Sequence, residues 1–335
     1  MKTYRITTVI GVLLTLFCLA CRLWVAVADA YALHVYPVVS DVLSWLSAWL
    51  SFPLQELLVL LLIAVAVAFI VLGCRKQLAW RRVACYELTL LMWTYVWFYM
   101  SWCNNYTRSS IFARAETPHS QYDETQFKAF VSDFTDSINA NWTADTFTDL
   151  AVLEAETKRF FADVPECYGL TTPRSWHRPK GMLLNRFYSA VGVQGFIAPL
   201  LAESCVNADL LPSEYPFVYM HEYSHMLGVS NEAEAHWWAF QCSTHSGYQS
   251  VRYSGYKDIL PHVMVNARRL LSEAEYREWV AQLRPEVKED VRKSSEHWQA
   301  LRSSWLDTMQ SEIYDLFLKS NRIESGRKNY SQVVD

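Results

Sequence analysis

The sequence predicts a mainly α-helical membrane protein: three N-terminal transmembrane helices followed by an extracytoplasmic α+β domain with a small edge sheet. Two observations predict this fold class. Three long apolar segments fall within the first third of the chain, and helix-period patterns with one short β-like run fill the rest. We therefore expect a membrane anchor over residues 1–102 and one folded domain over residues 103–335.

The three apolar segments are residues 6–28, 54–73 and 83–101. The first two are long enough to cross a bilayer. The third is weaker, because Glu87 interrupts it and its tryptophans and tyrosines are typical of an interfacial aromatic belt. Between the first two, residues 31–53 have apolar side chains at helical spacing, which predicts an amphipathic segment on the outer membrane face.

Basic residues predict the orientation of these spans. Lys2 and Arg5 precede the first span, and Arg75, Lys76, Arg81 and Arg82 lie between the second and the third. The loop between the first two spans contains no lysine or arginine. Because basic loops stay in the cytoplasm, we expect a cytoplasmic N-terminus and an extracytoplasmic C-terminal domain.

The strongest chemical signal is the pentapeptide that begins with His221-Glu222 and ends with His225. Two histidines four residues apart share one face of a helix, so they can bind one metal ion. Glu222 then lies where it can take a proton from a water molecule at the open position. The surrounding residues, from Pro216 to Gly228, predict a short buried helix. A pair of buried core histidines without a metal is the alternative, and it is costly to satisfy.

A catalytic zinc site needs a third protein ligand. Asn231 occupies the position where one large zincin group has a third histidine, and amides are poor zinc ligands. Glu232 and Glu234 remain as candidates. Asn231 and Glu234 have the spacing of a capping box, which favours Glu232 as the ligand and leaves Glu234 as the alternative. His236 is on the same helix face as Glu232 and is a candidate to orient its carboxylate.

Other segments of the second domain predict its scaffold. Residues 122–165 have the pattern of surface helices, and residues 191–197 form a β-like run that could hold a substrate backbone above the active-site helix. A predicted loop that contains Tyr253 offers candidate oxyanion donors, and a structural role is the alternative for each of them. Helices are predicted from Ser272 to about residue 284 and from Pro285 to about residue 318.

The cysteine positions and the net charge bear on possible disulfides and on the class of ligand. Cys103, Cys167, Cys205 and Cys242 fall in the expected outer domain, where disulfides can form, and the sequence cannot choose among their three pairings. The net charge is −4, and the outer domain has no basic cluster, so nucleic acid is not expected as a ligand.

The chain is similar to a family of bacterial membrane proteins, a domain of unknown function with zincin character. The similarity rests on residues 102–108, the motif from His221 to His225, Gly228, residues 232–235 and 252–254, and the tail around residues 314–321 with Gly326 and Tyr330. The E-x-E-A element resembles the helix of gluzincin peptidases whose first glutamate binds zinc, which implies Glu232. His236 stands where the family usually has asparagine. The resemblance implies a zincin-like domain and, with the spans, location in the bacterial inner membrane.

The predicted function is that of a membrane-anchored zinc peptidase. One Zn²⁺ is bound by His221, His225 and Glu232, Glu222 is the general base, and the partners are the lipid bilayer and a peptide or protein substrate. The alternative is a non-catalytic membrane sensor or assembly scaffold on a zincin fold. An intramembrane protease is disfavoured, because the motif begins about 120 residues beyond the last span.

Overall fold

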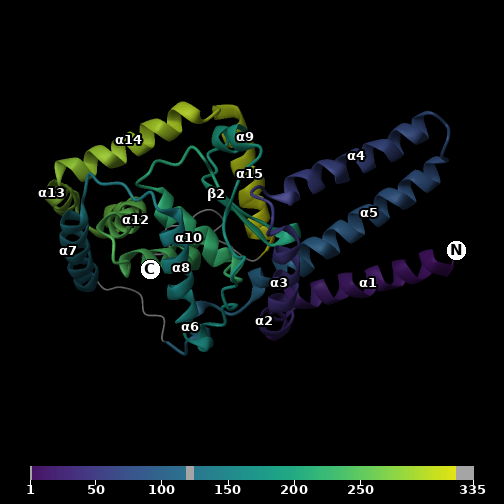
Figure 1. Ribbon diagram of the computed structural model, residues 1–335, viewed down its shortest axis with the longest axis horizontal. Helices are drawn as coiled ribbons and strands as arrows, with labels where there is room; N and C mark the ends of the chain where they lie inside the picture. The colour runs from purple at the N-terminus through teal and green to yellow at the C-terminus, as the bar shows by residue number, and fades with distance from the viewer. Residues whose placement is uncertain (1, 118–123, 322–335) are drawn as a thin grey trace.

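The computed structural model describes residues 2–117 and 124–321. Three long helices project from one side of a mostly helical body (Figure 1). We call α1, α4 and α5 the stalk, and residues 103–117 with 124–321 the body. The expected similarity around Gly326 and Tyr330 lies outside the described residues.

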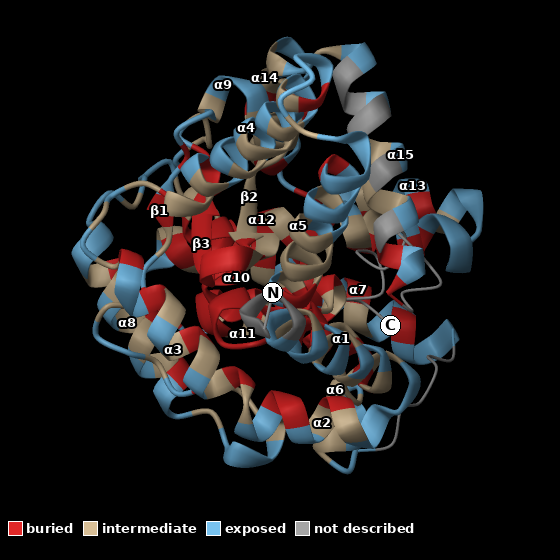
Figure 2. Ribbon diagram, turned by 90° about the vertical axis from the view of Figure 1, so that its right-hand side faces the viewer, coloured by how far each residue is buried: buried red, intermediate tan, exposed pale blue. Residues whose placement is uncertain are grey.

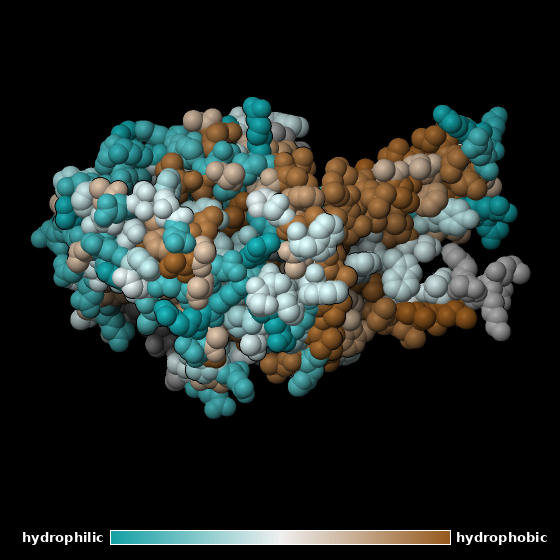
Figure 3. Space-filling model, in the orientation of Figure 1, coloured by the Kyte–Doolittle hydropathy of each residue, from teal (hydrophilic) through white to brown (hydrophobic). Residues whose placement is uncertain are grey.

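The stalk consists of α1 (Lys2–Leu23), α4 (Leu54–Cys74) and α5 (Trp80–Ser101). By length and composition, Ile6–Leu23 and Leu54–Cys74 could each cross a membrane. Only Glu56 and Gly73 of α4 are buried. Apolar side chains dominate the visible surface of α4 and α1, whereas the tip of the stalk is hydrophilic (Figure 3). The first predicted span ends earlier than expected, because Trp24 takes an extended conformation (φ −124°, ψ 114°) and interrupts the helix.

The prediction of three apolar spans is wrong for the third. Residues 83–101 are helical within α5, but only two helices in the described chain are apolar enough to count as spans. Arg81, Arg82 and Glu87 lower the hydropathy of α5. The helix packs against both α1 and α4, so it still belongs to the stalk.

Two short helices, α2 (Val25–His34) and α3 (Tyr36–Ser47), lie where the stalk meets the body (Figure 1). We call this end of the stalk its foot. The amphipathic segment predicted over residues 31–53 corresponds mainly to α3. Its buried face carries Ser40, Ser44 and Ser47 toward the protein, whereas Val38 and Trp45 are 64% and 61% exposed. The apolar face of α3 is therefore turned outward.

Long helices enclose the core of the body. They are α7 (Glu124–Asn141), α8 (Leu150–Ala162), α10 (Tyr215–Met226), α11 (Glu232–Thr244), α12 (Gln249–Leu270), α13 (Glu273–Gln282), α14 (Pro285–Leu301) and α15 (Ser304–Ser320). Shorter pieces are η1 (Cys103–Thr107), α6 (Ile111–Arg114), η2 (Glu166–Tyr168), α9 (Asn185–Ala190) and η3 (Pro199–Leu201). Helix α10 is buried from Pro216 onward and lies at the centre (Figure 2). The helix that carries the motif is therefore surrounded by protein, as the sequence predicts.

A three-stranded sheet lies beside α10. Strands β1 (Lys180–Gly181), β2 (Gly195–Ala198) and β3 (Glu203–Val206) have the order β1-β3-β2, with β1 parallel and β2 antiparallel to β3. The β-like run predicted over residues 191–197 becomes a strand only from Gly195. Strand β2 lies at an edge, so the expected small edge sheet is present.

Two expectations about the later helices need correction. The region around Tyr253, expected as a loop, is the first half of α12, where Tyr253 is buried. The helix expected from Pro285 to about residue 318 is divided into α14 and α15. The Ser303 N–H donates to the Ala190 carbonyl, so a contact with α9 replaces a helical bond at the break. The capping box of Ser272 and Glu275 is present at α13, as predicted.

Candidate metal centre

The two motif histidines lie side by side on α10. The Nε2 atoms of His221 and His225 are 3.2 Å apart, and their ring centroids are 4.7 Å apart. Residues four apart on a helix face the same way, which explains the approach. Both side chains are buried, so the two Nε2 atoms face each other and not bulk water.

A sharp turn brings a carboxylate to the histidines. Gly228 has φ of +95°, and a Cβ there would lie 3.0 Å from the Tyr36 ring, so this position requires glycine. Asn231 then caps α11 by accepting the N–H of Glu234. Glu232 is the first residue of α11, and its Oε2 lies 3.2 Å from His221 Nε2 and 3.6 Å from His225 Nε2.

These three atoms have the spacing of zinc ligands. Tetrahedral zinc with ligand bonds of about 2.0–2.1 Å holds its ligand atoms about 3.3 Å apart. The three separations here are 3.2, 3.2 and 3.6 Å. In the described chain, His221, His225 and Glu232 form the one group of histidine, cysteine and carboxylate side chains close enough to share an ion.

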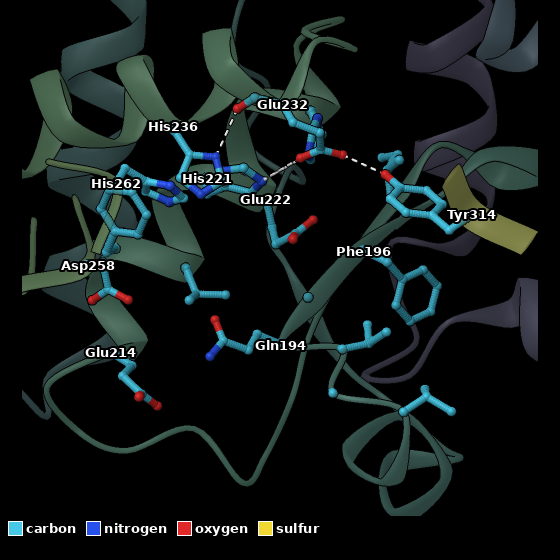
Figure 4. Close-up of a pocket in the computed structure, with 18 of the residues that line it drawn as sticks. Gln194, Phe196, Glu214, His221, Glu222, Glu232, His236, Asp258, His262 and Tyr314 are labelled. Atoms are coloured by element: carbon cyan, nitrogen blue, oxygen red, sulfur yellow. Dashed lines mark hydrogen bonds and ion pairs between the residues drawn. The ribbon is translucent and has the colours of Figure 1, made fainter. Parts of the chain in front are cut away.

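Hydrogen bonds from outside the cluster orient two of the ligands. The Nδ1 of His225 lies 2.6 Å from the Val229 carbonyl oxygen. A carbonyl only accepts, so Nδ1 carries the hydrogen and leaves the Nε2 lone pair for a metal. The Tyr314 hydroxyl donates to Glu232 Oε1 at 2.8 Å, which leaves Oε2 directed at the histidines. Figure 4 shows Tyr314 on the far side of Glu232 from His221.

Burial and electrostatic interactions shift the pKa values of the three clustered side chains. Burial opposes ionisation of Glu232, but the charge of His225 and hydrogen bonds from both histidines hold the pKa of Glu232 well below its usual range. Burial also opposes the charge on His225, yet the Glu232 carboxylate raises the pKa of His225 to about 9. Burial lowers the pKa of His221. Without a metal ion, the Glu232 carboxylate thus favours a positive charge on His225, whereas His221 stays neutral.

Glu222 is next to the cluster but does not belong to it. The side chain is buried, and its Oε2 has no hydrogen-bond partner among the described residues. Burial raises the pKa of Glu222 to about 8, which suits a group that takes and returns a proton near neutrality. Gly195 of β2 lies against it: a Cβ built there would be 2.4 Å from Glu222 Oε1. The strand and the carboxylate therefore border the same space (Figure 4).

The other predicted residues occupy different positions. Glu234 forms an ion pair with Arg114 and accepts the Trp238 indole N–H at 3.2 Å, so its carboxylate lies outside the cluster. Its backbone N–H bonds to Asn231 as predicted, but its side chain does not complete the capping box. Of the two candidates, the structure brings Glu232 to the histidines.

His236 and Tyr253 also differ from expectation. His236 Nδ1 bonds to the backbone oxygen of Glu232 at 2.8 Å, not to its carboxylate, and the His236 ring packs 4.4 Å from that of His221. It borders the site without orienting the ligand oxygen. The Tyr253 hydroxyl donates to Asp290 at 2.8 Å, away from the cluster. The structure therefore does not bring Tyr253 to the site as an oxyanion donor.

A cleft of about 1010 Å³ opens over the cluster. Its walls come from the foot of the stalk, from the segment that includes β2, and from α10, α11, α12, α14 and α15. Tyr314 and Gly195 are the site residues that sequence reasoning missed. Tyr314 belongs to a tail segment noted only for its similarity, and Gly195 lies within the predicted strand, so only a pairing of that strand with α10 could have identified it.

The cysteines contribute no cross-links. All eight are free thiols in the described chain, with Cys103, Cys205 and Cys242 buried and Cys167 exposed. None of the disulfides permitted by the four cysteines of the second domain is formed. The body is therefore held by packing, hydrogen bonds and ion pairs.

Fold and site together define a mainly helical protein with an apolar stalk and a buried His-His-Glu cluster on two consecutive helices. The chain belongs to the family described as protein of unknown function (DUF3810), which matches residues 31–335. No curated protein and no solved structure matches it. Family membership supplies no activity, so the functional argument depends on the geometry of the site.

Proposed function

We propose that this protein is a membrane-anchored, zinc-dependent peptidase. The observation that carries the proposal is the convergence of His221, His225 and Glu232 at zinc-ligand spacing. Beside them lies the buried Oε2 of Glu222, which has no hydrogen-bond partner among the described residues. A metal-free structural role explains the three-residue cluster but leaves a buried carboxylate oxygen without a partner, which is costly.

Each residue has a distinct task in this proposal. The Nε2 atoms of His221 and His225 and the Oε2 of Glu232 hold the ion. A zinc ion bound there would polarise a carbonyl group and lower the pKa of a water molecule to about 7. Glu222 accepts the proton of the attacking water and delivers it to the leaving amine. Tyr314 keeps the Glu232 carboxylate in place through its hydrogen bond to Oε1.

Strand β2 supports a peptide as the substrate. It pairs with β3 on one side, and the residues from Val193 to Ile197 line the cleft with the other side available. An extended peptide can add to such an edge through main-chain hydrogen bonds. The reacting carbonyl would then pass Glu222, because Gly195 is in contact with that side chain.

The proposed location follows from the stalk and the basic residues. The two apolar helices enter the inner membrane of a bacterium, and the basic turn after α4 stays in the cytoplasm. The body, at the opposite end of the stalk from this turn (Figure 1), is then extracytoplasmic. The proposed substrates are therefore peptides or proteins of the cell envelope.

Replacement of Glu222 by glutamine tests the proposal. Glu222→Gln keeps the shape of the side chain but cannot accept the proton, so hydrolysis of an unfolded protein such as casein should fall by at least about 100-fold. Zinc content should stay at the wild-type level, because Glu222 is not a ligand. Activity is measured on the purified full-length chain by mass spectrometry of the products.

The exposed Glu296→Gln substitution is a matched control that should leave activity unchanged. Full activity of Glu222→Gln would contradict the assigned base. A wild-type protein that binds zinc but cleaves no peptide, casein or envelope fraction would instead support the sensor or scaffold.

A further inference from the structure

The sheet beside the metal centre is bonded directly to the first turn of α4. The Glu203 carboxylate accepts the N–H groups of Leu54 and Gln55, each at 3.0 Å, and pairs with Lys180 at 2.8 Å. An acidic side chain at a helix N-terminus is stabilising, and this one is buried. The position of β3 is therefore fixed relative to the start of an apolar, span-length helix.

Strand β2 joins that helix end to the catalytic residues. Its last residue, Ala198, precedes η3, where the Leu200 N–H donates to the Gln55 side chain at 2.6 Å and the Leu200 carbonyl accepts the Trp97 indole N–H at 2.5 Å. Its first residue, Gly195, touches Glu222. Four residues of strand span about 10 Å, so the edge of β2 runs from the foot of the stalk to the catalytic residues over that short distance.

A second wall of the cleft is formed by residues of the stalk and of the segment that follows it. Phe98 of α5 and Trp102, Cys103 and Tyr106 just beyond it line the cleft. The Trp102 ring centroid lies 6.0 Å from that of His225, so a metal ligand contacts the residue that directly follows the stalk helix. The His-His-Glu cluster thus lies near the side of the body that joins the stalk, which we call the base of the body, where α4 begins and where α1 and α5 end.

Apolar side chains surround this base. Val38, Val42, Trp45 and Trp49 are exposed on and after α3, and Leu183, Leu184 and Phe187 are exposed near α9. The Glu56 carboxylate of α4 accepts the N–H groups of Leu183 and Leu184, so this second group also lies at the start of α4. Figure 3 shows apolar surface continuing from the stalk onto the adjoining face of the body. This surface fits contact with lipid.

We propose that the substrates are polypeptide segments that leave the bilayer in extended form beside the stalk, pair with β2 and are cut within about ten residues of the membrane surface. This inference rests on the proposed peptidase function. An extended chain covers about 3.3 Å per residue, so a segment that starts at the foot of the stalk reaches Glu222 after a few residues. Transmembrane proteins with unfolded juxtamembrane segments present this shape, whereas folded domains distant from the membrane do not.

Cleavage position relative to the bilayer tests the proposal. The probe is a carrier with one apolar helix of about 20 residues followed by a casein-derived unfolded segment, reconstituted with the full-length chain in phosphatidylethanolamine–phosphatidylglycerol vesicles. Spacers of about two or about six Gly-Ser residues separate the helix from the casein segment, so casein residues lie within about ten residues of the helix in both carriers. Products are mapped by mass spectrometry, and the same segment without the helix is the soluble comparison.

The expected result is a set of cuts at a constant distance from the helix, moving in sequence as the spacer lengthens. The tethered segment should be cleaved at least tenfold faster than the soluble one. Cuts that stay at fixed casein residues for every spacer, with equal rates for the soluble segment, would overturn the inference while leaving the peptidase proposal intact. No cleavage of either form would overturn both.

A binding measurement gives a second readout that needs no turnover. Phe196, which lines the cleft on β2, is replaced by a photoreactive benzophenone amino acid in the Glu222→Gln chain. Cross-links should form to carrier residues within about ten positions of its helix. Phe112 on α6, exposed and outside the cleft lining, is the matched position and should give none. Equal cross-linking from both positions would contradict the proposed path.

Discussion

At the scale of single residues, the two oxygens of Glu232 have separate partners. Oε2 faces His221 and His225, and Oε1 accepts the Tyr314 hydroxyl at 2.8 Å. A carboxylate that is already fixed by a hydrogen bond to one oxygen loses less conformational entropy, when its other oxygen binds an ion, than a freely rotating carboxylate does. Hydrogen bonds of this kind typically change metal affinity by about 10–100-fold when they are removed.

Tyr314→Phe should therefore weaken zinc binding by about 10–100-fold while the protein remains folded. The substitution removes only the hydroxyl that positions Glu232. Zinc affinity is measured on the purified full-length chain by competition with a chelator of known affinity, and folding is followed by circular dichroism.

Tyr253→Phe is the matched control, because its hydroxyl donates to Asp290 away from the cluster. It should lower the free energy of unfolding by about 1 kcal/mol and leave zinc affinity unchanged. An equal loss of affinity in both variants would mean that Tyr314 acts only through general stability.

Sequence reasoning predicted the three clustered side chains better than the residue that positions one of them. His221 and His225 follow from helical spacing, and Glu232 follows directly after a helix cap that lies three residues beyond a glycine, so both signals are local. Tyr314 is 82 residues from Glu232 along the chain. The tail around Tyr314 was noted for its family similarity, but nothing there indicates a contact with Glu232, because that contact depends on where α15 packs in the fold.

At the scale of elements, the approach of β2 to α10 decides the shape of the reaction space. Gly195 is the closest point, where the absence of a side chain leaves room for the Glu222 carboxylate. The position does not need glycine for its backbone angles, since its φ lies outside the positive range. Its importance is steric.

Gly195→Ala should lower peptidase activity by about 100-fold, because the new Cβ would lie 2.4 Å from Glu222 Oε1 and displace the base. Zinc content should remain at the wild-type level. Gly181→Ala in β1 is the matched strand control, since no atom lies within 4 Å of a Cβ there, and it should leave activity unchanged. Steady-state rates with a fluorescent peptide compare the variants, and wild-type activity of Gly195→Ala would refute the steric argument.

Element boundaries were predictable where the signal was local. The capping box of Ser272 and Glu275 marked the start of α13, and Gly228 marked the end of α10. The break between α14 and α15 has no such signal, because it depends on the bond from Ser303 to Ala190. The first turns of α12 were read as a loop from their glycine and serine content, although Ser254 and Gly255 are buried within the helix.

At the scale of the whole molecule, α15 connects the His-His-Glu cluster to the stalk. Tyr314 on α15 contacts Glu232, and near its end the Ser320 carbonyl accepts Arg22 of α1 at 2.6 Å. Asn321 then accepts the Tyr99 hydroxyl of α5 at 2.9 Å. The last turns of α1, α5 and α15 thus meet at the base of the body.

Composition alone predicted the stalk, because long apolar helices are recognised without knowledge of their contacts. The attachment of the body could not be predicted in this way. It depends on Glu203, Lys180 and Glu56, charged residues whose partners are backbone groups or residues far away in the sequence. The third predicted span failed because the charged residues of α5 lower its hydropathy below that of the two apolar helices, although α5 packs against both of them.

The zinc content of matched glutamine variants tests the central claim most directly. The purified full-length chain should hold about one zinc ion, as a three-ligand site requires, measured by plasma mass spectrometry after dialysis. Glu232→Gln should lose most of it, because an amide is a poor zinc ligand, whereas Glu234→Gln should retain it. A wild-type chain without stoichiometric metal, or a Glu232→Gln chain that keeps its full zinc content, would contradict the account.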